Sequence, residues 1–150
     1  PGPGPGPGPG PGPGPGPGPG DCTAPPTAGN FGDACGDFSI AALDAYVSSV
    51  DSANAATWMA IIPLESSFDP NATAAAVNGT AYGLLQMDSG LNGQFDNGQV
   101  NWKIQVSNAV AYNNNLAVKW CYWGSAYPPA PTHPNSLGIV TYAQCGISPF

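Results

Sequence analysis

Apolar residues at helical spacing mark the first helix of the chain. Between residues 37 and 50 they recur every three or four positions, which places them on one face of a helix: Ile40, Leu43, Val47 and Val50. Asp37 precedes them and is a suitable N-cap, because its carboxylate can accept a backbone N–H of the first turn. We therefore expect an amphipathic helix from Asp37 to about Val50.

A second helix is expected to follow and to reach Glu65. Pro63 lies inside it and cannot donate a backbone hydrogen bond, so we expect a kink or a tight last turn there. The helix should stop at Phe68, because the residue before Pro70 disfavours helical geometry.

A third apolar seam predicts the central buried helix. Its members step by four and three along the chain: Trp102, Val106, Ala109, Asn113, Leu116 and Trp120. Asn113 is polar within this seam, so it must find a hydrogen-bond partner.

The segments between and after these helices favour turns. Asn78-Gly79 is a strong hairpin signal, and residues 84–87 form a short buried run. Asn135 or Ser136 can cap a last helix through Gln144. We therefore expect a mainly α fold of the α+β kind, with a small β-hairpin or irregular lobe beside a cleft.

The composition separates a linker from a domain. Residues 1–20 are ten Pro-Gly dipeptides, and residues 21–150 suffice for one core. The period of two excludes collagen, which needs glycine at every third position. We expect the tract to be a semi-rigid spacer to a further module that precedes residue 1.

The charge of the chain excludes several partners. Two lysines and nine acidic residues give a net charge of -7, which argues against nucleic acid and against acidic lipid. The sequence contains no apolar run of about 20 residues, the length that a membrane-spanning helix needs. His133 has no second histidine with which to bind a metal, so neither a metal nor another cofactor is expected.

Four cysteines indicate an oxidising, extracellular setting and two disulfides among Cys22, Cys35, Cys121 and Cys145. Their pairing is open, because four cysteines allow three connectivities. Asn71 and Asn78 begin glycosylation sequons, which are compatible with secretion.

Glu65 is the first candidate for chemistry, because it is the only glutamate in the chain. It falls on the apolar stripe of the second helix, where partial desolvation favours the protonated carboxyl. Such a group can serve as a general acid. Hydrolysis of a glycoside usually takes a second carboxylate, which here must be an aspartate. Asp88 directly follows the buried run 84–87 and is preferred over Asp69 and Asp96, which are typical of turns.

Two motifs resemble those of the lysozyme-like superfamily that contains goose-type lysozymes and soluble lytic transglycosylases. They are Glu65-Ser-Ser-Phe-Asp-Pro-Asn-Ala72 and Tyr82-Gly-Leu-Leu-Gln-Met87. A third, looser match spans residues 105–112, with Gln105 and Ala109 where the family has Asn and Gly.

The resemblance implies a lysozyme-like fold and assigns roles in it. Glu65 would be the general acid and Asp88 would hold the attacking water of an inverting hydrolase. Tyr112 would orient Glu65. A sugar-binding cleft would be lined by Ser66, Tyr82, Gly83, Leu84, Gln86, Tyr112 and Trp123, the last of these by stacking or, alternatively, only as a core residue.

The function expected is that of a secreted, monomeric muramidase of fungal type that cleaves the β-1,4 bond between N-acetylmuramic acid and N-acetylglucosamine in bacterial peptidoglycan. Three alternatives stay open: a lytic transglycosylase that uses Glu65 alone, a chitinase-like activity, and an inactive carbohydrate-binding domain.

Overall fold

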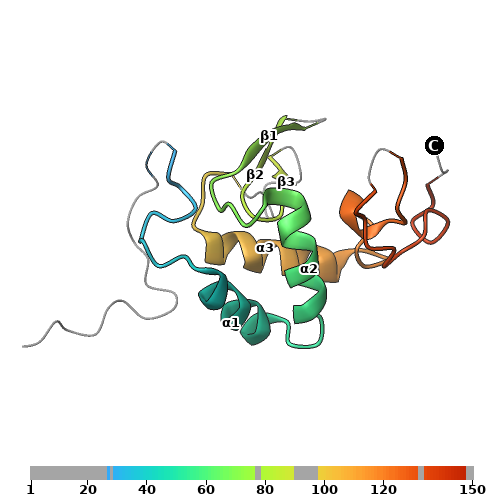
Figure 1. The fold of residues 1–150 in the computed structure, drawn as a ribbon, viewed down its shortest axis with the longest axis horizontal. Helices are drawn as coiled ribbons and strands as arrows, with labels where there is room; N and C mark the ends of the chain where they lie inside the picture. Colours follow the sequence, from blue (N-terminus) through green and yellow to red (C-terminus); the bar gives the residue numbers. More distant parts are fainter. Residues whose placement is uncertain (1–26, 28, 77–78, 90–97, 132–133, 148–150) are drawn as a thin grey trace, which may run out of the picture.

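The computed structural model describes residues 27, 29–76, 79–89, 98–131 and 134–147. Figure 1 shows three helices with a small antiparallel sheet above them, an α+β domain. The elements are α1 (Ile40–Val50), α2 (Ala55–Ser66), β1 (Thr73–Ala76), β2 (Gly79–Tyr82), β3 (Met87–Asp88), α3 (Trp102–Asn115) and the 3-10 turn η1 (Gly124–Ala126). The expectation of helices with a small β element is confirmed.

Several predicted features lie outside the described residues: the Pro-Gly tract, Cys22, Asn78, Asp96 and His133. Within the described residues, none of the helices is long and apolar enough to cross a membrane.

Helix α1 forms where it was expected but is capped by a different residue. Ser39 Oγ accepts the backbone N–H of Ala42 at 3.1 Å, so Ser39 is the N-cap. The prediction of Asp37 was wrong, because its carboxylate instead accepts hydrogen bonds from Trp102 Nε1 and Lys103 Nζ at the start of α3. Asp37 thus ties the entry to α1 to the entry to α3.

Helix α2 contains Pro63, as expected, and ends at Ser66, two residues before Phe68. Ser67 and Phe68 have left-handed backbones, with φ of 54° and 65°, which turns the chain away from the helix axis. Trp58, Ile61 and Ile62 are buried. This turn leaves Glu65 in the last turn of a firmly packed helix.

The three strands form an antiparallel sheet in the order β1-β2-β3. Ala76 pairs with Gly79 and Thr73 pairs with Tyr82, which confirms the predicted hairpin. Tyr82 also pairs with Met87 in β3. The buried run was predicted correctly, because Leu84 and Met87 have no exposed surface.

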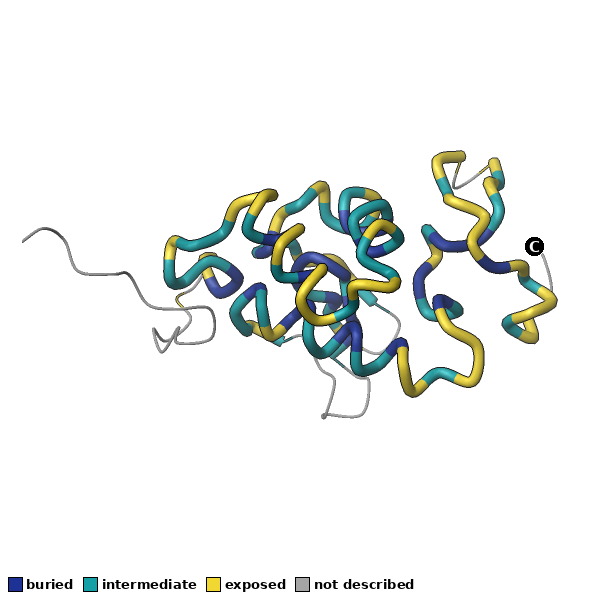
Figure 2. Tube along the Cα trace, turned by 90° about the horizontal axis from the view of Figure 1, so that it is seen from below, coloured by how far each residue is buried: buried dark blue, intermediate teal, exposed yellow. Residues whose placement is uncertain are grey.

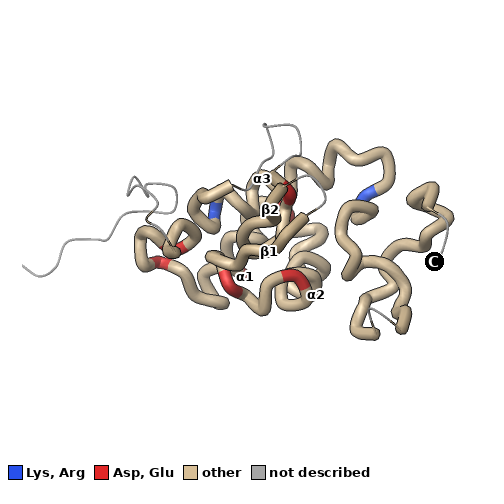
Figure 3. Tube along the Cα trace, turned by 90° about the horizontal axis from the view of Figure 1, so that it is seen from above, with Lys and Arg blue, Asp and Glu red and all other residues tan. Residues whose placement is uncertain are grey.

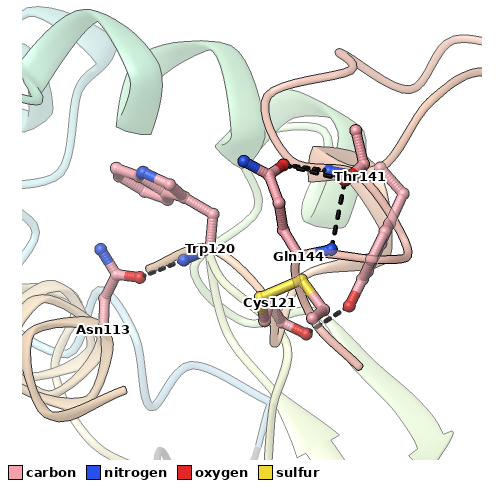
Figure 4. Close-up of a disulfide and its surroundings, with 7 residues drawn as sticks. Asn113, Trp120, Cys121, Thr141 and Gln144 are labelled. Atoms are coloured by element: carbon pink, nitrogen blue, oxygen red, sulfur yellow. Dashed lines mark hydrogen bonds between the residues drawn. A yellow bond between two sulfur atoms is a disulfide. The ribbon is translucent and has the colours of Figure 1, made fainter. Parts of the chain in front are cut away.

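Helix α3 is the central helix, and the first part of its predicted seam is buried: Trp102, Val106, Ala109 and Asn113. Trp120 lies beyond the helix end but still covers the core, with φ of 73°. Its backbone N–H donates to Asn113 Oδ1 at 2.7 Å, the partner that Asn113 required (Figure 4).

Residues 120–131 and 134–147, here called the C-terminal segment, lie together at one end of the molecule (Figures 1 and 2). The last helix predicted from Asn135 or Ser136 to Gln144 is absent from the described part of this segment. Gly138 takes a left-handed φ of 64°, and its N–H donates to Tyr127 O at 2.8 Å. The backbone of residues 137–140 therefore bonds across to the region of η1, and residues 141–147 bond locally, in turns.

A disulfide between Cys121 and Cys145 closes the C-terminal segment (Figure 4). Tyr127 Oη donates to Cys121 O at 2.7 Å and braces the same junction. Of the two disulfides expected, this is the one with both cysteines among the described residues. Cys35 is also disulfide-bonded.

Candidate active site

Glu65 lines an open pocket between the end of α2 and the C-terminal segment. Glu65 is half-buried, and the pocket has a volume of about 340 Å³. Its other lining residues are Leu64, Gly124, Ser125, Pro134, Asn135 and Ser136. Among the described residues that line the pocket, Glu65 is the one charged residue, so it offers a carboxyl group beside the Asn135 amide and two serine hydroxyls.

Ser125 holds the carboxyl group of Glu65. Ser125 Oγ donates to Glu65 Oε1 at 2.6 Å, a short bond of the kind made to a charged acceptor. Ser125 lies in η1, and its carbonyl accepts the N–H of Leu137 at 2.8 Å. The hydroxyl is therefore presented by a backbone that is itself hydrogen-bonded.

Asp88 lies at the end of β3 and is nearly buried, with 7% of its surface exposed. Its backbone N–H donates to Tyr122 Oη at 2.8 Å. The position is thus firm, as the sequence predicted for a residue that follows a buried run. Asp88 does not belong to the described lining of the pocket at Glu65.

Tyr122 is a mostly buried phenol that contacts Asp88. Burial raises the pKa of Tyr122 to about 12, and the hydrogen bond from Asp88 N–H partly opposes this rise. Negative charge on Asp88, Tyr112 and Glu65 raises the pKa further, because it disfavours a phenolate. Glu65 and Asp88 thus act on a single phenol, although they come from different elements.

Gly83 and Leu84 were expected on the floor of the cleft, but both are buried. Gly83 has φ of 71°, and a Cβ there would lie 2.1 Å from Gln105 Oε1. The same oxygen accepts Leu84 N–H at 2.8 Å. These residues let the buried Gln105 amide pack against the turn, and neither belongs to the described lining of the pocket at Glu65.

The polar motif residues are bonded within the protein. Gln86 Nε2 donates to Gly83 O at 2.8 Å, which closes the turn before β3. Ser66 Oγ donates to Ile62 O at 3.2 Å in the last turn of α2. Tyr82 packs edge-on against Phe31, with ring centroids 5.8 Å apart.

The other two aromatic candidates for the cleft, Tyr112 and Trp123, differ in how far they are buried. Tyr112 is half-buried and packs edge-on against Tyr122, with ring centroids 5.2 Å apart. Trp123 is 1% exposed, and its Nε1 donates to Leu85 O at 3.0 Å. The expected stacking of Trp123 on a sugar is not supported, because the ring belongs to the core.

Sequence reasoning missed Ser125, Asn135 and Ser136, which line the same pocket as Glu65. They lie in a stretch read as a proline-rich loop and as the start of a helix, and no periodic pattern distinguishes them. The sequence feature that came nearest to indicating an ordered pocket wall was Cys121, because a disulfide can hold such a loop in place.

Comparisons with known proteins do not assign this chain to a family. No protein-family model, no curated protein and no solved structure matches this chain. Within the described residues, no group of three or more His, Cys, Asp or Glu side chains could hold a metal ion.

Proposed function

We propose that this chain is a glycoside hydrolase that acts on amino-sugar polymers, with Glu65 as its general acid. The observation that carries the proposal is the position of the only glutamate, half-buried at a helix end and lining an open pocket of about 340 Å³. Ligand pockets commonly have volumes of about 300–1,000 Å³. A half-buried carboxyl group in a pocket is suited to donate a proton to a leaving oxygen.

The walls of the pocket fit an uncharged sugar unit. Asn135 and Ser136 offer an amide and a hydroxyl, which can bond to the hydroxyl and N-acetyl groups of such a unit. Neither lysine lines the pocket: Lys103 pairs with Asp37, and Lys119 follows α3 (Figure 3). We propose the β-1,4 bond between N-acetylmuramic acid and N-acetylglucosamine as the bond cleaved, and peptidoglycan as the polymer.

In the proposed reaction Glu65 protonates the glycosidic oxygen and Asp88 positions water on the other face of the sugar. This is the inverting arrangement of two carboxyl groups. Support for Asp88 comes from its fixed position, because its backbone N–H donates to Tyr122 Oη at 2.8 Å. We further propose a lysozyme-like fold, secretion to the cell exterior, action as a monomer, and a spacer role for residues 1–20.

A second candidate, a lytic transglycosylase, is favoured by one observation. Asp88 is only 7% exposed and is not among the residues that line the pocket. In that reaction the substrate's own hydroxyl attacks, so Asp88 would serve the structure alone. The product would then be an anhydro sugar, lighter by one water than the hydrolysis product.

The test compares Glu65→Gln with Asp44→Asn on purified cell walls, with mass analysis of the fragments. Asp44 is exposed on α1, so its change is a matched loss of one carboxylate away from the pocket. Glu65→Gln should lower cleavage by at least about 100-fold, the usual contribution of a general acid, while Asp44→Asn stays active. Full activity of Glu65→Gln would refute the catalytic assignment.

Asp88→Asn separates the two reactions. Loss of cleavage together with hydrated products from the native chain supports the hydrolase. Retained cleavage with anhydro products supports the transglycosylase. A native chain that binds cell walls but releases no fragment would instead be a carbohydrate-binding domain.

A further inference from the structure

We infer that Ser125 is the positioning residue for Glu65: its hydroxyl orients the carboxyl group and stabilises the carboxylate that proton donation leaves behind. The catalytic meaning of this inference rests on the proposed function. The contact itself is the 2.6 Å hydrogen bond from Ser125 Oγ to Glu65 Oε1.

The bond fixes the geometry of the acid. Glu65 has several rotatable bonds, and a hydrogen bond to Oε1 sets the plane of its carboxyl group. Oε1 is thereby turned towards η1, which defines the direction of Oε2. A defined direction matters because a general acid must lie within hydrogen-bond reach of the oxygen it protonates.

The bond also favours the charge that develops. When the glycosidic bond breaks, the O–H bond of Glu65 breaks, its proton joins the leaving oxygen, and its electron pair stays on the carboxylate. A hydrogen bond to an ionised acceptor is about twice as strong as a neutral one. Ser125 therefore stabilises the carboxylate more than the carboxylic acid from which it forms.

The C-terminal segment keeps Ser125 in place by three independent links. Leu137 N–H donates to Ser125 O, and Ile139 N–H donates to Ala126 O, both at 2.8 Å. The Cys121–Cys145 disulfide closes the segment around these bonds. A hydroxyl on such a backbone can act as a fixed partner for a residue of α2.

The decisive measurement is the titration of Glu65 itself. Because Glu65 is the only glutamate, selective ¹³C labelling of glutamate gives one side-chain carboxyl signal in NMR spectra. We compare the native chain with Ser125→Ala, which removes the donor, and Ser125→Thr, which keeps it. Ser49→Ala is the matched control, because Ser49 is exposed on α1 and donates only to Tyr46 O among the bonds described.

Ser125→Ala should move the Glu65 titration midpoint upward by about one pH unit, because the lost hydrogen bond is stronger to the ionised carboxylate than to the carboxylic acid. Ser125→Thr and Ser49→Ala should titrate as the native chain does. An unchanged midpoint in a folded Ser125→Ala chain overturns the inference.

Enzyme kinetics provide a second readout, which a general loss of folded structure would not produce. In Ser125→Ala, kcat should fall about 10-fold with little change in KM, while the fall of activity at high pH moves to higher pH. Equal loss at every pH would contradict the inference. If the native chain cleaves no polymer, the proposed function fails, and the NMR titration still decides whether Ser125 controls Glu65.

Discussion

The helical body and the C-terminal segment of this protein are held together by different means. The body consists of α1, α2 and α3, which share an apolar core in which Leu43, Ile61 and Trp102 are fully buried. The C-terminal segment has one short 3-10 turn, a disulfide and backbone bonds such as Gly138 N–H to Tyr127 O. Packing stabilises the first region, and the second adds cross-links to the packing of its own buried residues, such as Trp123 and Val140.

The candidate site lies where these two regions meet. The body supplies Glu65 from the end of α2, and the C-terminal segment supplies Ser125. Tyr122, also from the C-terminal segment, accepts the backbone N–H of Asp88 in β3. The contrast teaches that an acid on a rigid helix can take its partners from an irregular segment, provided that the segment is fixed by covalent and backbone links.

The largest effect is expected from removing the disulfide with the double variant Cys121→Ala, Cys145→Ala. The bond joins residues separated by 24 positions. A loop of this length predicts a loss of about 3 kcal/mol in the free energy of unfolding in the chain-entropy model. We expect the loss to be local, with faster amide exchange at Gly138 and Ile139 and little change at Leu43.

Hydrogen exchange with site resolution checks this expectation, and urea unfolding gives the global stability. Equal acceleration of amide exchange at Leu43 and Gly138 would show that the helical body and the C-terminal segment unfold as one unit, which would contradict a local loss of stability. Cell-wall cleavage should fall in parallel with the loss of protection at Gly138, because Ser125 depends on the same segment.

The helical body could be predicted from sequence because burial there follows a period. Leu43 and Val47 in α1, and Val106 and Ala109 in α3, occupy the buried positions that the period assigns, whereas Ile40 and Val50 at the ends of α1 were also expected on the buried face and are exposed. The hairpin at Gly79 was found from its turn signal. The wrong N-cap at Asp37 has a tertiary cause, since Trp102 and Lys103 draw its carboxylate away.

The site could be predicted only in part. Glu65 was singled out because it is unique and follows an apolar stripe, and it does line a pocket. Ser125 and Asn135 could not be found in this way, because a disulfide and long-range backbone bonds place them. Residues 135–144 carry caps and apolar positions typical of a helix, but Gly138 and the bonds to the region of η1 prevent one.

A second, smaller effect is expected from Tyr122→Phe. The variant leaves the Asp88 N–H without its phenol acceptor, which should lower the free energy of unfolding by about 1–2 kcal/mol at neutral pH. The pKa of Tyr122 is raised to about 12 in the folded chain, mainly by burial, against about 10 when unfolded. The folded state therefore favours the protonated phenol, and this stability is lost as pH rises from about 10 to 12.

Urea unfolding between pH 8 and pH 11.5 checks this sign. The native chain should lose stability over the upper part of that range, and Tyr122→Phe should lose less. Tyr46→Phe is the matched control, because Tyr46 bonds to Ser107 within the helical body. The same alkaline slope in native and Tyr122→Phe chains would refute the role assigned to the buried phenol.

The smallest effect is expected from Asp37→Asn, within the helical body. Burial raises the pKa of Asp37, but the hydrogen bonds from Lys103 and Trp102 outweigh it, so the net pKa is lowered. A lowered folded pKa gives stability that is present above the unfolded value of about 4 and lost as pH falls below it. Since the Asp37 side chain is 35% exposed, solvent screening limits the effect to about 1 kcal/mol or less.

Urea unfolding at pH 7 and at pH 3 tests this, with Asp44→Asn as the exposed control on α1. The native chain should lose slightly more stability on acidification than Asp37→Asn, because only the native chain has this carboxylate to protonate. Amide exchange in the C-terminal segment should not respond, since Asp37 bonds to the start of α3. A response at Gly138 as large as that at Leu43 would mean that the packed body and the cross-linked segment are energetically coupled, and that the site depends on both.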